Sequence, residues 1–180
     1  MGDHFRLSAN VTYLDSHYVD YKNATLTTLG TFCASASHVG NIYCEAAFGG
    51  NGNPGIAQDL SGRPTSFAPA WSGGLTATYS TQVVGDYELS VSISPYFTSS
   101  YFLAGSNTDD PFLKQSAYLR VDARLTLESP DGNWSFDLIG KNLTDRTILT
   151  FGIGQPASPG SFIYGKQMPS NIAGQIRYRW

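Results

Sequence analysis

The chain has 180 residues, which is enough for one domain of ordinary size. Its net charge is −3 and only 14% of its residues are charged, so the composition gives no argument for a nucleic-acid partner. No stretch approaches the roughly 20 consecutive apolar residues that a membrane-spanning helix requires. This excludes a helical span but leaves open a transmembrane β-barrel, because the strands of such a barrel are apolar at only every second position.

Strict alternation of apolar and polar residues dominates the chain, and a period of two is typical of β-strands. The first run starts at Phe5, where Phe5, Leu7 and Val11 share one face and Arg6 and Ser8 share the other. We therefore predict strands rather than helices throughout. The six predicted strands lie near residues 5–14, 70–80, 87–98, 117–128, 134–143 and 171–180.

The run at 117–128 has the clearest pattern, with one wholly apolar and one wholly polar face. The apolar positions are Leu119, Val121, Ala123, Leu125 and Leu127. The polar positions are Arg120, Asp122, Arg124, Thr126 and Glu128. A strand with two such faces separates an apolar environment from a polar one.

The connections between the runs alternate in length. Long stretches at 15–66, 101–116 and 145–170 are separated by short ones at 81–86 and 129–133. Outer-membrane barrels show this order, with long loops outside the cell and short turns on the periplasmic side. The first strand is then expected to run outward and the last to end on the periplasmic side.

Aromatic residues on the apolar faces fall near the ends of the predicted strands. Rings are favoured at the two membrane–water interfaces, whereas the core of a soluble sheet more often holds them in mid-strand. Those at the expected periplasmic ends are Phe5, Tyr79, Tyr87, Trp134, Tyr178 and Trp180. Those at the expected outer ends are Tyr13 and Trp71.

Several segments resemble the C-terminal end of TonB-dependent outer-membrane receptors. Gly140-Lys141-Asn142-Leu143-Thr144-Asp145-Arg146 is similar to the family's G-K-N-L-T-D-[KR] element. Ile176-Arg177-Tyr178-Arg179-Trp180 resembles its terminal L-R-Y-R-F pattern. Asp59-Leu60-Ser61-Gly62, followed by Ala68-Pro69-Ala70-Trp71-Ser72, looks like the start of a late strand in the family. The resemblance covers essentially the whole chain.

The resemblance implies an antiparallel transmembrane barrel in the outer membrane, with an N-terminal plug domain that contacts TonB and with ferric siderophores, cobalamin or sugars as cargo. The chain lacks a plug and a TonB-contacting box, and has only about six of the family's usual 22 strands. We therefore interpret residues 1–180 as the C-terminal part of the barrel domain, an incomplete barrel that is not an enzyme and needs no cofactor. The first residues, Met1-Gly2-Asp3-His4-Phe5-Arg6, do not form a signal peptide, so we expect the true N-terminus to be missing.

The expected partners are outer-membrane lipid, the plug and remaining strands of the receptor, the barrel assembly machinery, and TonB through the missing plug. The charged residues of the polar faces are expected to line the lumen. They are Arg6, Glu88, Arg120, Asp122, Arg124, Glu128, Asp137, Lys141, Arg177 and Arg179. The last strand is expected to act as an assembly signal, with Gly174 easing close approach or bending. The signal residues are Gly174, Ile176, Tyr178 and Trp180.

The predicted loops hold the remaining candidate sites. Cys33 and Cys44, the only two cysteines, are expected to form a disulfide if the protein is exported. The pair Asp109-Asp110 is interpreted as solvated, and the scattered histidines do not have metal-ligand spacing. Aromatic residues in the outer loops suit either the binding of rings and sugar faces or packing within the loops. They are Tyr18, Tyr21, Phe32, Tyr43, Phe48, Tyr101, Phe102, Phe112, Phe151, Phe162 and Tyr164.

Two other interpretations remain open. A secreted or soluble all-β binding module, stapled by the cysteine pair, would bury the apolar faces in a core and bind through its loops. A small complete barrel of six to eight strands would need additional strands near 147–153 and 161–166. Apolar faces buried in a closed core would indicate the soluble module rather than a membrane barrel. The pairing of any strands near 147–153 and 161–166 tests the small complete barrel.

Overall fold

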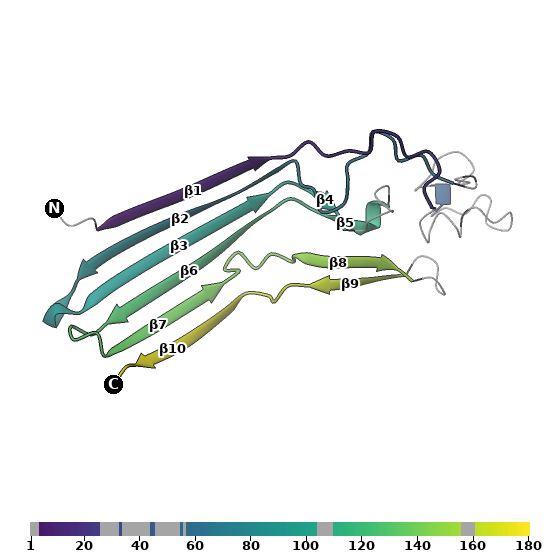
Figure 1. Ribbon diagram of the computed structural model, residues 1–180. Coiled ribbons are helices and arrows are strands. Elements are labelled where there is room, and N and C mark those ends of the chain that lie inside the picture. The colour runs from purple at the N-terminus through teal and green to yellow at the C-terminus, as the bar shows by residue number, and fades with distance from the viewer. Residues whose placement is uncertain are drawn as a thin grey trace.

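The fold is an open antiparallel sheet of six strands, and a computed structural model describes residues 4–25, 33, 44–45, 55, 57–103, 110–155 and 161–180 (Figure 1). The strands follow each other in chain order, and β1 and β10 form the two edges. Their bounds are β1 Phe5–Tyr13, β2 Trp71–Gln82, β3 Glu88–Thr98, β6 Tyr118–Glu128, β7 Trp134–Lys141 and β10 Asn171–Tyr178. The predicted strands and their next-neighbour pairing are confirmed, and this sheet does not close on itself.

Two short ribbons extend the hairpins beyond one end of the sheet, where the sequence predicted only loops (Figure 1). One ribbon pairs β4 (Tyr101–Phe102) with β5 (Lys114–Gln115), next to a 3-10 turn at Pro111–Leu113. The other pairs β8 (Leu149–Gly154) with β9 (Phe162–Lys166). Since β8 and β9 pair with each other, they add no strand to the main sheet, and a closed small barrel does not form within the described residues.

Tight turns join the strands at the opposite end, where both chain termini lie (Figure 1). A short 3-10 turn at Val84–Asp86 connects β2 to β3, and its Gly85 has φ +73°. Between β6 and β7, Gly132 has φ +70° and its N–H donates to the Ser129 carbonyl oxygen at 2.9 Å. Glycine adopts such left-handed conformations without a steric penalty, which explains the tight reversal at Gly132.

The pairing register keeps the alternation in phase from one edge of the sheet to the other. One row across the sheet consists of Ala77, Ile93, Ala123, Gly140 and Ile172. The next row consists of Tyr79, Val91, Leu125, Leu138 and Gly174. Apolar residues therefore form one continuous face, and polar residues occupy nearly all of the other.

The apolar face is uncovered in the described part of the chain. Leu7 is 58% exposed on β1, Leu138 is 43% exposed on β7 and Ile172 is 69% exposed on β10. The fully buried apolar side chains lie instead beyond the sheet, and among them are Leu60, Leu103, Leu113 and Ile148. The apolar residues of the main sheet thus do not fill a closed interior.

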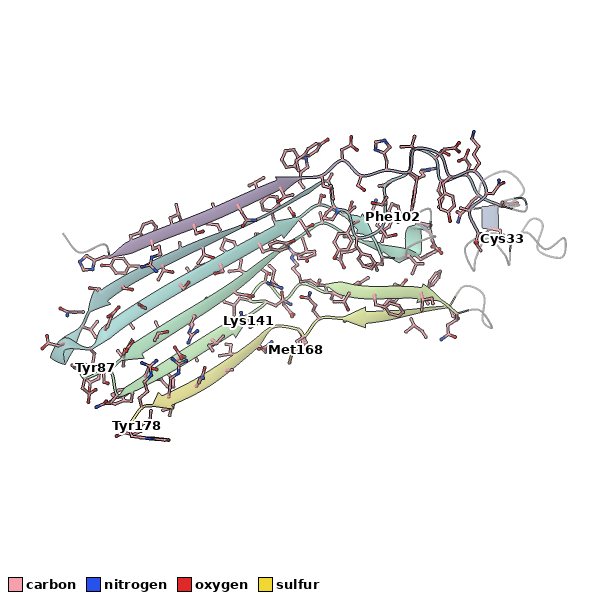
Figure 2. The ribbon with its side chains drawn as sticks, in the orientation of Figure 1. Cys33, Tyr87, Phe102, Lys141, Met168 and Tyr178 are labelled. Carbon is pink, nitrogen blue, oxygen red and sulfur yellow. A yellow bond between two sulfur atoms is a disulfide. The ribbon has the colours of Figure 1, made fainter. Side chains whose placement is uncertain are left out.

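Aromatic rings border this apolar face at both ends. At one end the rings of Tyr13 and Trp71 lie 4.8 Å apart, and at the other those of Tyr87 and Trp134 lie 5.5 Å apart. Figure 2 shows Tyr87 and Tyr178 near the same end of the sheet. At about 3.4 Å per residue, the strand from Phe5 to Tyr13 separates the two ends by roughly 27 Å.

Two glycines on this face differ in what their surroundings require. A Cβ at Gly73 would lie 2.6 Å from the Asn10 carbonyl oxygen and 2.7 Å from Cε1 of Phe97, so only glycine fits there. A Cβ at Gly174 would meet only Cε2 of Phe136, at 3.8 Å. Within the described residues no close neighbour requires a glycine at this position, and the expectation that Gly174 eases close approach or bending during assembly stays a prediction.

Cys33 and Cys44 are joined by a disulfide, with their Cα atoms 5.6 Å apart and both residues buried. Cys33 lies far beyond the end of the sheet that carries the ribbons (Figure 2). None of the described helical segments is long and apolar enough to cross a membrane.

If the protein is exported, we expect neither cysteine to react with a maleimide in the native protein, and both to react after reduction, because the bond occupies both thiols. Replacing both residues with serine should destabilise the loop between them by about 2–3 kcal/mol through chain entropy. Mass spectrometry of labelled protein gives the number of free thiols. Two freely reactive thiols before reduction would reject the bridge.

Candidate functional site

The polar face of the sheet carries all ten charged residues that the sequence analysis assigned to the lumen. The register places them on this one face, from Arg6 on β1 to Arg177 on β10, and Arg179 follows two residues later. Shallow hollows lie along the described part of this face, between residues of β6 and β7. The face therefore has the chemistry of a binding surface for a polar partner.

A buried carboxylate fixes the middle of the polar face. Asp137 on β7 is only 1% exposed and accepts hydrogen bonds from both Nε and Nη2 of Arg124, at 3.1 and 2.8 Å. The Thr126 hydroxyl donates to the same carboxylate at 2.6 Å. This two-point geometry is the strong form of an ion pair, and it ties β6 to β7.

A second cluster lies nearer the ribbons and centres on Asp122. Lys141 Nζ donates to Asp122 Oδ2 at 3.2 Å, and the Asn142 backbone N–H donates to Oδ1 at 2.9 Å. Arg120 Nε lies 3.5 Å from Asp122 Oδ1 and is buried without a hydrogen-bond partner, while its Nη1 donates to the Gln167 side chain at 3.3 Å. Asp122 thus neutralises part of a basic corner lined by Arg120 and Lys141.

One of these hollows, which we call the end hollow, lies at the tight-turn end of the face. It is lined by Arg124, Thr126, Glu128, Gly132, Asn133, Trp134, Ser135, Asp137, Arg177 and Arg179. Nearby, Glu88 and Glu128 stand directly opposite each other across β3 and β6. Like charges in that position repel each other, so they destabilise the strand pair.

The G-K-N-L-T-D-R segment forms a compact turn that leads the chain out of β7. Asn142 has φ +50°, a left-handed conformation that asparagine tolerates better than most residues. Its side chain donates to the Arg146 carbonyl oxygen at 2.9 Å and accepts from the Arg146 N–H at 3.0 Å. Asp145, at φ +47°, accepts a hydrogen bond from the Ser170 N–H at 3.1 Å.

The same segment is fastened to β6, and Leu143 packs against the glycine at its start. The Leu143 N–H donates to the Val121 carbonyl oxygen at 2.8 Å, and the Thr144 hydroxyl donates to the Leu119 carbonyl oxygen at 2.9 Å. A Cβ at Gly140 would lie 2.8 Å from Leu143 Cδ2. These contacts give the segment a structural role, holding the exit of β7 and the return to β10 together.

The segment Asp59-Leu60-Ser61-Gly62 has a similar role beyond β1 and β2. The Ser61 N–H donates to Asp59 Oδ1 at 2.9 Å, and hydrogen bonding from Ser61 lowers the pKa of Asp59. Gly62 has φ +75° and its N–H donates to the Tyr18 carbonyl oxygen at 2.7 Å, while Leu60 is fully buried. This turn joins the two long arms that lead toward the disulfide.

The two ribbons pack against each other around a small apolar core. A Cβ at Gly152 would lie 3.0 Å from Leu113 Cδ2 and 3.2 Å from Leu103 Cδ1, so the glycine allows close approach. The Leu149 N–H donates to the buried side chain of Gln115 at 2.7 Å. Sequence reasoning missed this core because β4 and β5 have only two residues each, too few to show a period.

Aromatic rings form a short row on the ribbons. Phe112 and Phe162 have ring centroids 5.2 Å apart, and Phe162 and Tyr164 have centroids 6.2 Å apart. The Tyr164 hydroxyl donates to the Phe112 carbonyl oxygen at 2.8 Å. These contacts show packing between the ribbons, whereas Phe32, Tyr43 and Phe48 lie outside the described residues.

Asp110 differs from the solvated residue that the sequence predicted. It is 3% exposed and accepts a hydrogen bond from the Phe112 N–H at 2.9 Å, which caps the 3-10 turn at Pro111–Leu113. Burial raises the pKa of Asp110 above its usual range. Its sequence neighbour Asp109 lies outside the described residues, as does His38.

Among the described residues, no group of three or more His, Cys, Asp or Glu side chains is placed to hold a metal ion. Comparison with known proteins adds no assignment: no family model, no curated protein and no solved structure matches the chain. The chemistry of the site therefore rests on the two faces of the sheet and on the ribbons.

The Asn142 turn can be tested by two substitutions. Asn142→Ala removes the side-chain hydrogen bonds and leaves an unfavourable left-handed backbone, so we expect it to lower the free energy of unfolding by about 1–3 kcal/mol. Asn142→Gly keeps the backbone conformation and should be less damaging. Urea unfolding of the chain in detergent measures both, with Asn10→Ala as the control on an exposed β1 residue. Equal stability of the two alanine variants would contradict the role of the turn.

Proposed function

We propose that the chain is a wall segment of an outer-membrane active-transport receptor, formed by the last strands of its barrel. One observation carries this proposal: a six-stranded sheet with one continuous apolar face that is uncovered and bordered by aromatic rings. Exposing such a face to water is unfavourable, whereas the hydrocarbon core of a bilayer would cover it. At the usual strand tilt of about 40°, the roughly 27 Å between the aromatic ends rises about 21 Å through the membrane, which approaches the apolar band of about 25 Å found on such barrels.

The alternative, a soluble binding module, would bury the apolar face against a second layer. The main sheet has no such layer within the described residues, and its apolar side chains remain exposed on every strand. This arrangement favours the membrane interpretation over the soluble one.

Loop lengths support an orientation in that membrane. The tight turns before β3 and β7 would face the periplasm, and the ribbons and disulfide-bonded arm would face outward. The polar face, with Arg124–Asp137 and the Asp122 cluster, would line the lumen opposite a plug domain. The outer aromatic row would lie where a siderophore, cobalamin or a sugar-like nutrient first meets the receptor.

The transport role rests on the resemblance of the G-K-N-L-T-D-R and terminal I-R-Y-R-W segments to TonB-dependent receptors. In this proposal the missing plug and the other barrel strands complete the receptor, and TonB acts through the plug. The segment itself carries out no catalysis and needs no cofactor.

The membrane-facing assignment can be tested with two adjacent residues on β3. Ile93 lies in the middle of the apolar face, and Ser94 lies on the polar face opposite Asp122. Ile93→Arg should destabilise the inserted state by about 2–4 kcal/mol, because a charge near mid-bilayer is poorly solvated. Ser94→Arg, the matched control, should change stability little.

Urea unfolding in lipid vesicles measures the effect of each substitution, and fractionation of the unmodified protein tests its location. A chain that stays in the aqueous fraction without detergent, or equal stability of the two arginine variants, would favour the soluble module.

The last strand provides a test of assembly. Ile176 on β10 is 76% exposed, and Trp180, two residues beyond the end of that strand, is fully exposed. The outer edge of β10 is unpaired in the described residues. An unpaired edge can add to another sheet, which suits recognition by the barrel assembly machinery. In the full-length receptor, deleting Trp180 or changing both Tyr178 and Trp180 to serine should block insertion but not synthesis.

Outer-membrane yield and heat-modifiable migration on a gel report the outcome of these changes. An Arg146→Gln receptor serves as the control, because this residue lies outside the last strand. Normal amounts of folded, inserted receptor in the Tyr178/Trp180 variant would reject the assembly signal.

A further inference from the structure

The end hollow has a surplus of positive charge on one side. Arg177 on β10 and Arg179 just beyond that strand line this hollow and are exposed, and Arg177 lies close enough to Asp137 to attract its carboxylate electrostatically. They are two residues apart, so their side chains point to the same side. Two adjacent guanidinium groups repel each other unless an anion lies between them.

The carboxylates nearest to these arginines, Asp137 and Glu128, neutralise them only in part. Asp137 is buried, accepts hydrogen bonds from Nε and Nη2 of Arg124 and from the Thr126 hydroxyl, and attracts Arg177 only through space. Glu128 lies on β6, two strands away from β10, which is roughly 10 Å at the usual strand spacing. The hollow therefore holds three arginines, Arg124, Arg177 and Arg179, and two carboxylates, Asp137 and Glu128, which leaves one positive charge in excess.

We propose that the end hollow is a carboxylate-binding site in which Arg177 and Arg179 hold an acidic peptide segment. The planar guanidinium fork matches a carboxylate at two points, which makes arginine well suited to this ligand. The proposal rests on the proposed function, because that function places the polar face in the lumen, where a polypeptide rather than lipid is the neighbour.

The geometry favours a peptide over a lipid phosphate. Tyr178 lies between the two arginines in sequence and points to the opposite, apolar face, where the register pairs it with Trp134. Lipid headgroups would meet that aromatic face, whereas the arginines are turned away from it. An acidic segment can approach along the polar face and contact both guanidinium groups.

The test uses the full chain refolded in detergent and a fluorescent hexaglutamate peptide at low ionic strength, with hexaglutamine as the uncharged comparison. Hexaglutamate should bind and hexaglutamine should not, and added salt should weaken binding because it screens exposed charges. The double variant Arg177→Gln/Arg179→Gln should weaken hexaglutamate binding by about tenfold. Arg146→Gln, which removes a positive charge outside the sheet, should leave it unchanged.

Fluorescence anisotropy measures binding, and circular dichroism with heat-modifiable migration checks that each variant folds. Equal hexaglutamate binding by the double variant and the unmodified chain would overturn the site, as would equal binding of both peptides. Loss of binding to phosphatidylglycerol vesicles, with peptide binding unchanged, would instead identify lipid as the occupant. If the chain is water-soluble and binds hexaglutamate, the membrane role is rejected and the carboxylate site stands. If the chain inserts into membranes but does not bind hexaglutamate, the carboxylate site is rejected and the membrane role stands.

Discussion

The register of strand pairing is the constraint on which the rest of the structure depends. Each pairing aligns the apolar positions of one strand with those of the next, so that Leu125 meets Val91 on one side and Leu138 on the other. A shift by one residue in any of these pairs would turn that strand's apolar side chains to the polar face. Because the pairs are in phase, the sheet has one apolar and one polar face, and these faces determine what each side of the sheet can contact.

The two faces were predictable from the sequence because they follow from a period of two that needs no tertiary information. The sequence also predicted the tight turn before Trp134, since the Asp-Gly pair within it favours left-handed backbone at Gly132. The ten charged residues of the polar face follow from the same alternation. Alternation does not predict which charged residues pair with each other. The two hydrogen bonds between Arg124 and Asp137 are seen only in the structure.

The parts that sequence reasoning missed depend on contacts between distant segments. The ribbons form because Leu103 and Leu113 pack against the glycine at 152, and no local pattern records that proximity. Asp110 was expected in solvent, yet it is buried because its carboxylate caps a turn within this same cluster.

The alternation of short and long connections also sets an order for folding. Short turns join β2 to β3 and β6 to β7, so these two hairpins close with little loss of chain entropy. Pairing β1 with β2 requires closure of the long connection that contains Cys33 and Cys44. Each doubling of the length of a loop adds about 0.6 kcal/mol to the entropic free energy of closing it. The disulfide shortens that connection by bypassing the residues between the cysteines. The two central hairpins are therefore placed to form first, with the edge strands adding to them later.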